Sequence, residues 1–175
     1  MQKFALMIST MLMTLVFAAP MHAQEASQLL REQALMDQDI ALALAPIRSQ
    51  VQLQQHLQTN GRNSPLAALT PAAQKRFLAS LRFNEKGITS FSYDDLQAEL
   101  TASQIYQVLS LFGAQHTTSF MRNARVVTPV DQALLQPLGT TGPLCPSQPC
   151  DYDQYECEKK GTCAAAFNKI CTRNC

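Results

Sequence analysis

Residues 1–144 contain no cysteine, and all six cysteines of the chain lie within residues 145–175. Charge is scarce as well: charged residues make up 15% of the chain, with 14 Lys and Arg against 13 Asp and Glu. A nearly neutral chain cannot neutralise a phosphate backbone, which requires clustered basic residues, so no nucleic-acid partner is expected. The same neutrality argues against a cationic peptide that disrupts membranes.

The sequence also lacks the short motifs that carry familiar catalytic chemistry. It contains no nucleophile-elbow pattern, no paired-histidine zinc helix, no phosphate-binding glycine loop and no dinucleotide fingerprint. Two histidines, His56 and His116, lie beyond the N-terminal segment, and nothing around them distinguishes them from surface histidines. We therefore expect no catalytic residue, no cofactor and no metal site, and the chain is not predicted to be an enzyme.

One long apolar run is present, at the N-terminus. A single charge, Lys3, precedes the apolar residues 4–19, after which Pro20 ends the run and Ala23 offers a cleavage position. This is the layout of a secretory signal peptide, and the run is short for a membrane span, which needs roughly 20 residues. Residues 1–23 are therefore predicted to direct export, to the periplasm or out of the cell. No transmembrane segment is expected in the mature chain.

Apolar periodicity and capping residues indicate helices through most of residues 24–125. Residues 25–60 are predicted to be helical from a cap at Ser27, with a break near Pro46, because proline lacks an amide donor and clashes with the preceding turn. The segment ITSFSY indicates only a short extended link. Further helices are expected from Thr70 to Gly87, over DDLQAEL after Ser92, and from Thr101 to Gly113.

The composition changes after Val126. Five of the nine prolines lie between Pro129 and Pro149, and such a segment forms neither a regular helix nor a central strand. A proline-rich linker is therefore expected, with one helical turn at VDQALLQ. The predicted fold class is mainly α, comprising a signal peptide (1–23), a small helical domain (24–125), the linker (126–143) and a disulfide-stapled C-terminal module (144–175).

The cysteines of this C-terminal module have three interpretations. A structural zinc site needs close pairs and would leave Cys157 and Cys163 unused, whereas a reactive thiol needs an odd cysteine or a lowered pKa. In an oxidising compartment an even set predicts disulfides, which a segment too small to bury a core requires. We therefore predict three disulfides, with a connectivity that spacing alone does not decide. They join Cys145, Cys150, Cys157, Cys163, Cys171 and Cys175.

Within the module, two conformations are expected. The segment CPSQPCDYDQYEC is predicted to be strand-like, whereas Thr162 caps a predicted helix over the alanine-rich segment that follows it. That helix would place Cys163, Phe167 and Cys171 on one face, where they could be cross-linked to the strand-like half.

Tyr152 and Tyr155, together with Lys159 and Lys160, form a candidate recognition surface in the module, with the tyrosines as contact anchors. The alternative interpretation is a solvated surface on which acidic and basic residues pair locally.

Three functions are compatible with these features. The first is an exported, non-catalytic binding protein that recognises another protein or a cell-surface component through the C-terminal module. The second is a precursor whose cysteine-rich peptide is released as a toxin-like, bacteriocin-like or inhibitor peptide, although the linker has no dibasic or double-glycine cleavage site. The third is an enzyme, or an enzyme accessory, without a familiar motif. The sequence favours the first.

Overall fold

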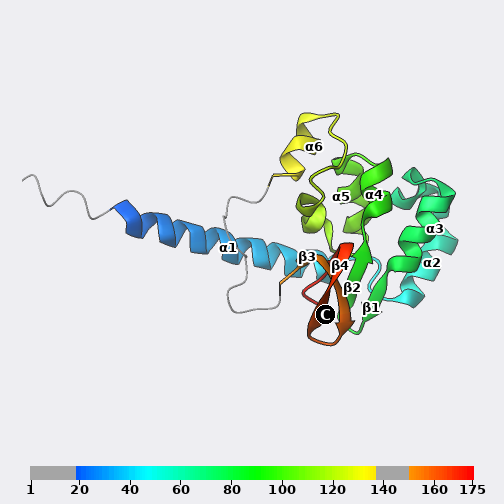
Figure 1. Cartoon of the computed structure of the whole chain (residues 1–175), viewed down its shortest axis with the longest axis horizontal. Coiled ribbons are helices and arrows are strands. Elements are labelled where there is room, and N and C mark those ends of the chain that lie inside the picture. The colour runs from blue at the N-terminus through cyan, green and yellow to red at the C-terminus, as the bar shows by residue number, and fades with distance from the viewer. Residues whose placement is uncertain (1–18, 137–149) are drawn as a thin grey trace, which may run out of the picture. The chain divides into compact units, whose positions relative to one another are not determined.

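The computed structural model describes residues 19–136 and 150–175, shown in colour in Figure 1. Most of the predicted signal peptide, part of the predicted linker and the first residues of the predicted C-terminal module, including Cys145, lie outside the described residues. The chain divides into two compact units, residues 1–36 and residues 37–175. The elements are α1 (Ala19–Leu44), α2 (Gln50–Asn60), η1 (Gly61–Asn63), η2 (Pro65–Ala68), α3 (Pro71–Ser80), β1 (Arg82–Asn84), β2 (Gly87–Ser92), α4 (Asp94–Glu99), α5 (Ala102–Ser110), η3 (Gln115–Phe120), α6 (Pro129–Leu134), β3 (Tyr152–Lys159) and β4 (Thr162–Cys171).

The predicted break near Pro46 is confirmed, because α1 ends at Leu44 and α2 begins at Gln50. Ser49, rather than the predicted Ser27, acts as a cap in this region: its side chain accepts a hydrogen bond from the amide of Gln52 at 3.2 Å. Ser27 lies inside α1 and starts no helix.

The predicted caps at Thr70 and Thr101 are confirmed, whereas α4 begins after Tyr93 with no side-chain cap, although Ser92 was predicted to cap it. Thr70 caps α3, with Pro71 at the first helical position, where the missing proline amide costs nothing. Thr101 and Gln104 form a reciprocal capping box at the start of α5. However, α3 ends at Ser80 rather than near Gly87, and the chain then enters β1.

The prediction of a mainly α fold is wrong, because the structure contains a four-stranded antiparallel sheet in the order β1-β2-β4-β3. The predicted link ITSFSY lies largely in β2, where every residue from Gly87 to Phe91 is buried. Strand β2 is a central strand that pairs with β1 on one side and with β4 on the other, so that Phe91 lies opposite Ile170. The cysteine-rich segment therefore shares one sheet with the strands that follow α3.

The predicted helix after Thr162 is also wrong, because Thr162–Cys171 forms strand β4. Its alanines favour a helix, but the two-residue turn Lys160-Gly161 folds the segment back onto β3, with Lys159 opposite Thr162. Gly161 adopts φ = +75°, a conformation that glycine takes without steric strain. The strand-like conformation predicted for the preceding half is confirmed over β3.

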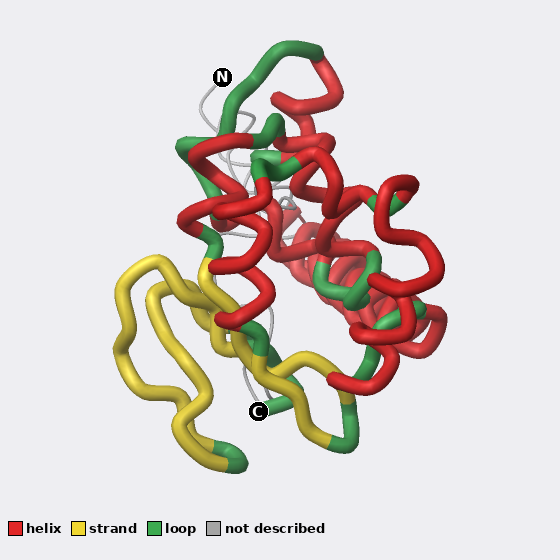
Figure 2. The backbone as a smooth tube through the Cα atoms, turned by 90° about the vertical axis from the view of Figure 1, so that its right-hand side faces the viewer, coloured by secondary structure: helices red, strands yellow, loops and turns green. Residues whose placement is uncertain are grey.

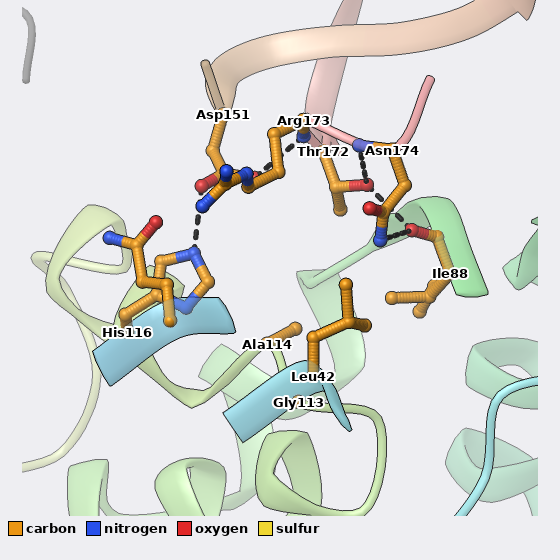
Figure 3. Close-up of a pocket in the computed structure, with 10 residues that line it drawn as sticks. Leu42, Ile88, Gly113, Ala114, His116, Asp151, Thr172, Arg173 and Asn174 are labelled. Atoms are coloured by element: carbon orange, nitrogen blue, oxygen red, sulfur yellow. Dashed lines mark hydrogen bonds and ion pairs between the residues drawn. The ribbon is translucent and has the colours of Figure 1, made fainter. Parts of the chain in front are cut away.

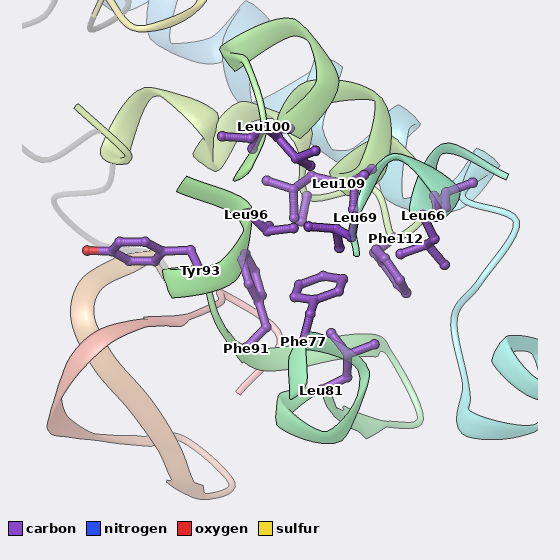
Figure 4. Close-up of a cluster of buried hydrophobic side chains, with 14 of the residues drawn as sticks. Leu66, Leu69, Phe77, Leu81, Phe91, Tyr93, Leu96, Leu100, Leu109 and Phe112 are labelled. Atoms are coloured by element: carbon purple, nitrogen blue, oxygen red, sulfur yellow. The ribbon is translucent and has the colours of Figure 1, made fainter. Parts of the chain in front are cut away.

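The core of the second unit lies between the helices and the sheet (Figure 4). The ring of Phe77 on α3 meets those of Phe91 and Phe112 edge to face, with centroids 6.3 and 6.1 Å apart. Edge-to-face contacts of this kind add to the stabilisation from burial. Residues 37–136, which contain most of the helices, are called the helical part below. Ile170 is fully buried in the same cluster, so the cysteine-rich segment contributes to the core of the helical part.

Gly113, which follows α5, permits a close approach by the end of α1. Its φ is +69°, and a Cβ atom placed on it would lie 2.6 Å from the Cα atom of Leu42. No side chain fits there, because the obstacle is backbone that cannot rotate away. This position holds residues 41 and 42 of α1 against the chain that leads into η3.

Candidate functional site

The candidate site is the hairpin β3–β4, which projects beyond the helices (Figure 2). Two disulfides cross-link it: Cys157 to Cys175 and Cys163 to Cys171, with Cα atoms 5.6 and 6.0 Å apart. Cys150 is disulfide-bonded as well. The prediction that these cysteines form disulfides is therefore confirmed for the five cysteines that the structure describes.

An irregularity in the hairpin sets the direction of its outer residues. The register shifts between Asp153 and Tyr155, and both Gln154 and Asn168 have positive φ values, 65° and 52°. The Asn168 amide donates a hydrogen bond to Oε1 of Gln154 at 2.9 Å, so each stabilises the unusual conformation of the other. Asparagine adopts this backbone region more readily than most residues.

The same irregularity is attached to the helical part through Tyr93, just before α4. The Tyr93 hydroxyl donates to Oδ1 of Asp153 at 2.9 Å, and its amide donates to the carbonyl of Asn168 at 3.0 Å. Burial, together with the Asp153 carboxylate, raises the pKa of Tyr93 above its usual value, so the hydroxyl stays protonated and able to donate. Asn168 also contacts Asp94 at the start of α4.

Three aromatic side chains are exposed on this anchored hairpin, and we call Tyr152, Tyr155 and Phe167 the aromatic face. Their exposed fractions are 48%, 39% and 82%. The two tyrosine rings contact each other, with centroids 5.8 Å apart. Tyr155 lies opposite Ala165 in the register, and Phe167, two residues further along β4, is exposed on the same side of that strand as Ala165.

The structure brings the two predicted tyrosines together, with their rings in contact, and places the predicted lysines at the other end of β3 from Tyr152. Lys159 and Lys160 are exposed at the turn of the hairpin, whereas Tyr152 lies at its base, opposite Cys171. Lys160 instead lies 3.5 Å from the carboxylate of Glu85, an exposed ion pair that contributes little to stability. Phe167, the most exposed member of the aromatic face, was predicted on a helix face to be cross-linked, not as a recognition residue.

A pocket at the base of the hairpin contains the second notable arrangement (Figure 3). His116 Nε2 lies 2.7 Å from Oδ2 of Asp151, whose Oδ1 accepts the amide of Arg173 at 2.9 Å. The Arg173 guanidinium also reaches Asp39 on α1, at 3.2 Å. His116 was predicted to be a surface histidine, and this is wrong, since only 18% of its side chain is exposed.

Opposing influences act on the Asp151 carboxyl. Burial alone would raise its pKa, but the hydrogen bond and charge of His116, with the Arg173 amide and charge, outweigh burial and hold that pKa below its usual range. Asp151 is therefore ionised under ordinary conditions. The sequence does not predict this pair, because His116 and Asp151 lie in different predicted domains and no local pattern links them.

The pocket is too small to hold a substrate, and its residues instead attach the hairpin to the helical part. Its volume of about 10 Å³ corresponds to a single water molecule, whereas sites for small organic ligands span roughly 300–1,000 Å³. Its polar groups connect η3, α1 and the residues on both sides of the hairpin. We interpret the His116–Asp151 pair as the contact that holds the hairpin base against the helical part.

The other histidine beyond the predicted signal peptide, His56 on α2, is only partly exposed. Its Nε2 lies 2.9 Å from the hydroxyl oxygen of Ser64. Ser64 is buried and also accepts the amide of Leu66 at 3.3 Å, as the cap of η2. This geometry is that of a turn stabilised by side chains.

The sulfur atoms of Cys157, Cys171 and Cys175 all lie within 4.8 Å of one another. Each belongs to a disulfide, and a disulfide sulfur carries no thiolate charge for a metal ion. Metal binding by this cluster would therefore require prior reduction.

Comparison of the chain with protein-family models, with curated proteins and with solved structures finds no match. Within the described parts of the chain, no helix has both the length and the apolar character needed to cross a membrane. The disulfides are consistent with an exported protein, since such bonds persist in oxidising compartments.

Proposed function

We propose that this chain is an exported binding protein that recognises a protein or another component of a cell surface through the aromatic face of the β3–β4 hairpin. The observation that carries the proposal is the exposure of Tyr152, Tyr155 and Phe167 on a hairpin cross-linked by two disulfides. Residues 1–23 would serve as the signal peptide.

The chemistry of these side chains supports a contact role. Aromatic residues are enriched among the side chains that dominate binding energies, because each buries a large area while fixing few rotatable bonds. An 82% exposed phenylalanine contributes little to the stability of the chain that bears it, whereas burial against a partner would remove that apolar surface from water. Phe167 is therefore the expected centre of the contact.

The rigidity of the hairpin supports the same role. The disulfides, the Tyr93–Asp153 hydrogen bond and the pairing of Asn168 with Gln154 all restrict the hairpin before any partner arrives. Preorganisation lowers the entropy that must be lost on association, so a small surface can bind more tightly.

The sheet topology favours this proposal over a released peptide. Strand β4 pairs with β2 of the helical part, and Ile170 is buried in the shared core. Release of residues 144–175 would leave Phe91 without its neighbour in the sheet and would expose both apolar side chains to water. The precursor hypothesis therefore requires an unfavourable exposure of apolar side chains that the binding hypothesis does not require.

Binding of the purified chain to intact cells of the producing organism tests the proposal. We expect saturable binding of the wild-type chain, and a loss of at least about tenfold in affinity for Phe167→Ser, since a central aromatic contact contributes about 1.4 kcal/mol or more. Tyr155→Ser should also weaken binding. Pretreatment of the cells with protease would then distinguish a protein partner from another surface component.

Tyr106 on α5 provides a matched control, because it is 38% exposed against 39% for Tyr155. Tyr106→Ser should leave affinity unchanged. Equal losses for Tyr106→Ser and Tyr155→Ser, or full affinity for Phe167→Ser, would contradict a role for the aromatic face.

A further inference from the structure

The two hairpin disulfides are close enough to react with each other. The sulfurs of Cys157 and Cys175 form one bond, and both lie within 4.8 Å of the sulfur of Cys171, which belongs to the other. Thiol–disulfide exchange proceeds by attack of a thiolate on a neighbouring disulfide sulfur. A thiolate released from the first bond is therefore positioned to attack the second.

The hairpin register also accommodates a different pairing. Cys157 and Cys163 lie directly opposite each other on β3 and β4. Opposed residues of an antiparallel pair have Cα atoms about 4.5–5.5 Å apart, within the range that a disulfide spans. The remaining cysteines, Cys171 and Cys175, already have neighbouring sulfurs. Both connectivities are thus compatible with one backbone.

We propose that Cys157–Cys175 is a reaction site for small thiols, at which one thiol converts the pairs Cys157–Cys175 and Cys163–Cys171 into Cys157–Cys163 and Cys171–Cys175. This reactivity is separate from the binding role proposed above and does not depend on it.

The exchange balances in three steps. The thiolate of the small thiol bonds to the Cys157 sulfur and releases the Cys175 thiolate. That thiolate bonds to the Cys171 sulfur and releases the Cys163 thiolate. Finally, the Cys163 thiolate bonds to the Cys157 sulfur and releases the small thiolate. No net oxidation or reduction occurs, so the small thiol is a catalyst.

Accessibility limits which sulfurs an external thiol can attack. Cys157, Cys163 and Cys175 are partly exposed, whereas Cys171 is fully buried. An external thiol therefore reaches the Cys157–Cys175 bond more readily than the sulfur of Cys171. Only a thiolate formed inside the hairpin is positioned to reach the buried sulfur.

The end of the chain stays in place during the exchange because hydrogen bonds hold it independently of sulfur. The Thr172 amide donates to the Thr89 carbonyl at 2.8 Å, and the Asn174 side chain donates to the Ile88 carbonyl at 3.0 Å. Asn84 reaches the Asn174 carbonyl at 2.6 Å. The exchange therefore requires no unfolding.

Peptide mapping of the full chain tests this proposal directly. The chain is incubated with reduced glutathione, blocked with an alkylating reagent and cut with trypsin, which separates all four cysteines onto residues 126–159, 161–169, 170–173 and 174–175. Before exposure, 161–169 should be joined to 170–173. After it, we expect 161–169 joined to 126–159, and 170–173 joined to 174–175.

The concentration of urea separates exchange in the folded chain from scrambling after unfolding. We expect the rate of conversion to stay constant in urea below the unfolding transition. Conversion that appears only in urea that unfolds the chain would overturn the proposal, as would the persistence of the original peptides after prolonged exposure to glutathione.

Two variants identify the sulfurs involved. Cys145→Ser/Cys150→Ser should still convert, because the steps use only the other four cysteines, and loss of conversion would contradict the assignment. In Cys175→Ser the Cys157 thiol begins free. We expect its thiolate to bond to the Cys163 sulfur, opposite which it lies in the register, and to release the Cys171 thiolate, without added thiol and at a rate independent of protein concentration. A thiol that remained at Cys157 would overturn the proposal.

Discussion

The helical part and the hairpin are stabilised by different means, although they share one sheet. Around Phe77 and Phe112 the chain buries apolar side chains against one another, and local caps begin the helices. The hairpin instead exposes the aromatic side chain of Phe167 and is held by disulfides and hydrogen bonds. A surface whose apolar side chains are not needed for the core remains available for contacts with other molecules.

The largest contrast should appear when one phenylalanine is removed from each region. Phe77→Ala deletes the ring that contacts both Phe91 and Phe112, and we expect a loss of about 3–5 kcal/mol in the free energy of unfolding. Phe167→Ala should change it by less than about 0.5 kcal/mol. Urea unfolding followed by circular dichroism measures both, and equal losses would contradict the comparison.

Removal of a disulfide, unlike removal of Phe167, should destabilise the chain. Cys157→Ser/Cys175→Ser opens a connection with a sequence separation of 18, which should cost roughly 3 kcal/mol through the added entropy of the unfolded chain. Cys163→Ser/Cys171→Ser, with a separation of 8, should cost slightly less. Unfolding midpoints measure this order, and a larger loss for the shorter loop would contradict the entropic explanation.

Loss of the His116–Asp151 pair should have a smaller effect than loss of Phe77 or of a disulfide. We expect Asp151→Asn to lower the free energy of unfolding by about 1–3 kcal/mol. Because the folded pKa of Asp151 is lowered, its contribution is complete above the ordinary aspartate pKa of 3.8 and disappears as the pH falls through the folded value. Unfolding free energies measured from pH 6 downwards, a range of roughly two units above that pKa, should fall more steeply for the wild-type chain than for Asp151→Asn. Parallel pH profiles would contradict this role.

The smallest effect distinguishes a true helix cap from a mistaken one. Thr101→Ala removes an acceptor from the start of α5 and should cost about 1 kcal/mol. Thr162, predicted to cap a helix, lies in β4, and Thr162→Ala should change the free energy of unfolding by less than about 0.5 kcal/mol. Thermal unfolding compares the two, and a cost for Thr162 equal to that for Thr101 would indicate a helix there.

The difference between the regions also explains how much the sequence could predict. The caps at Thr70 and Thr101 and the break near Pro46 depend on neighbours within a few residues, and the structure confirms all three. Strand β4 pairs with β2 only at residues 169–171, and no local pattern reveals that contact. Its alanines lie in the part that pairs with β3, and they indicated a helix although the Lys160-Gly161 turn was present in the sequence.

In the candidate site, too, the sequence predicts the residues that a local pattern identifies and misses those that depend on distant contacts. Tyr152 and Tyr155 could be selected because they stand close together in a polar segment. The exposure of Phe167 depends on the strand direction of β4, and the pairing of His116 with Asp151 spans 35 residues. The disulfide connectivity is equally non-local. A single sequence contains no direct measure of any of these contacts.

The pairing of β2 with β4 also determines the order in which the chain can fold. Ser90 pairs with Cys171, which is synthesised much later, so until then one edge of β2 is unpaired and only the short strand β1 pairs with the other edge. Contacts between residues so distant in sequence form slowly, and an unpaired strand edge can associate with other chains in the meantime. The arrival of β4 therefore both completes the fold and closes the surface through which immature chains would aggregate.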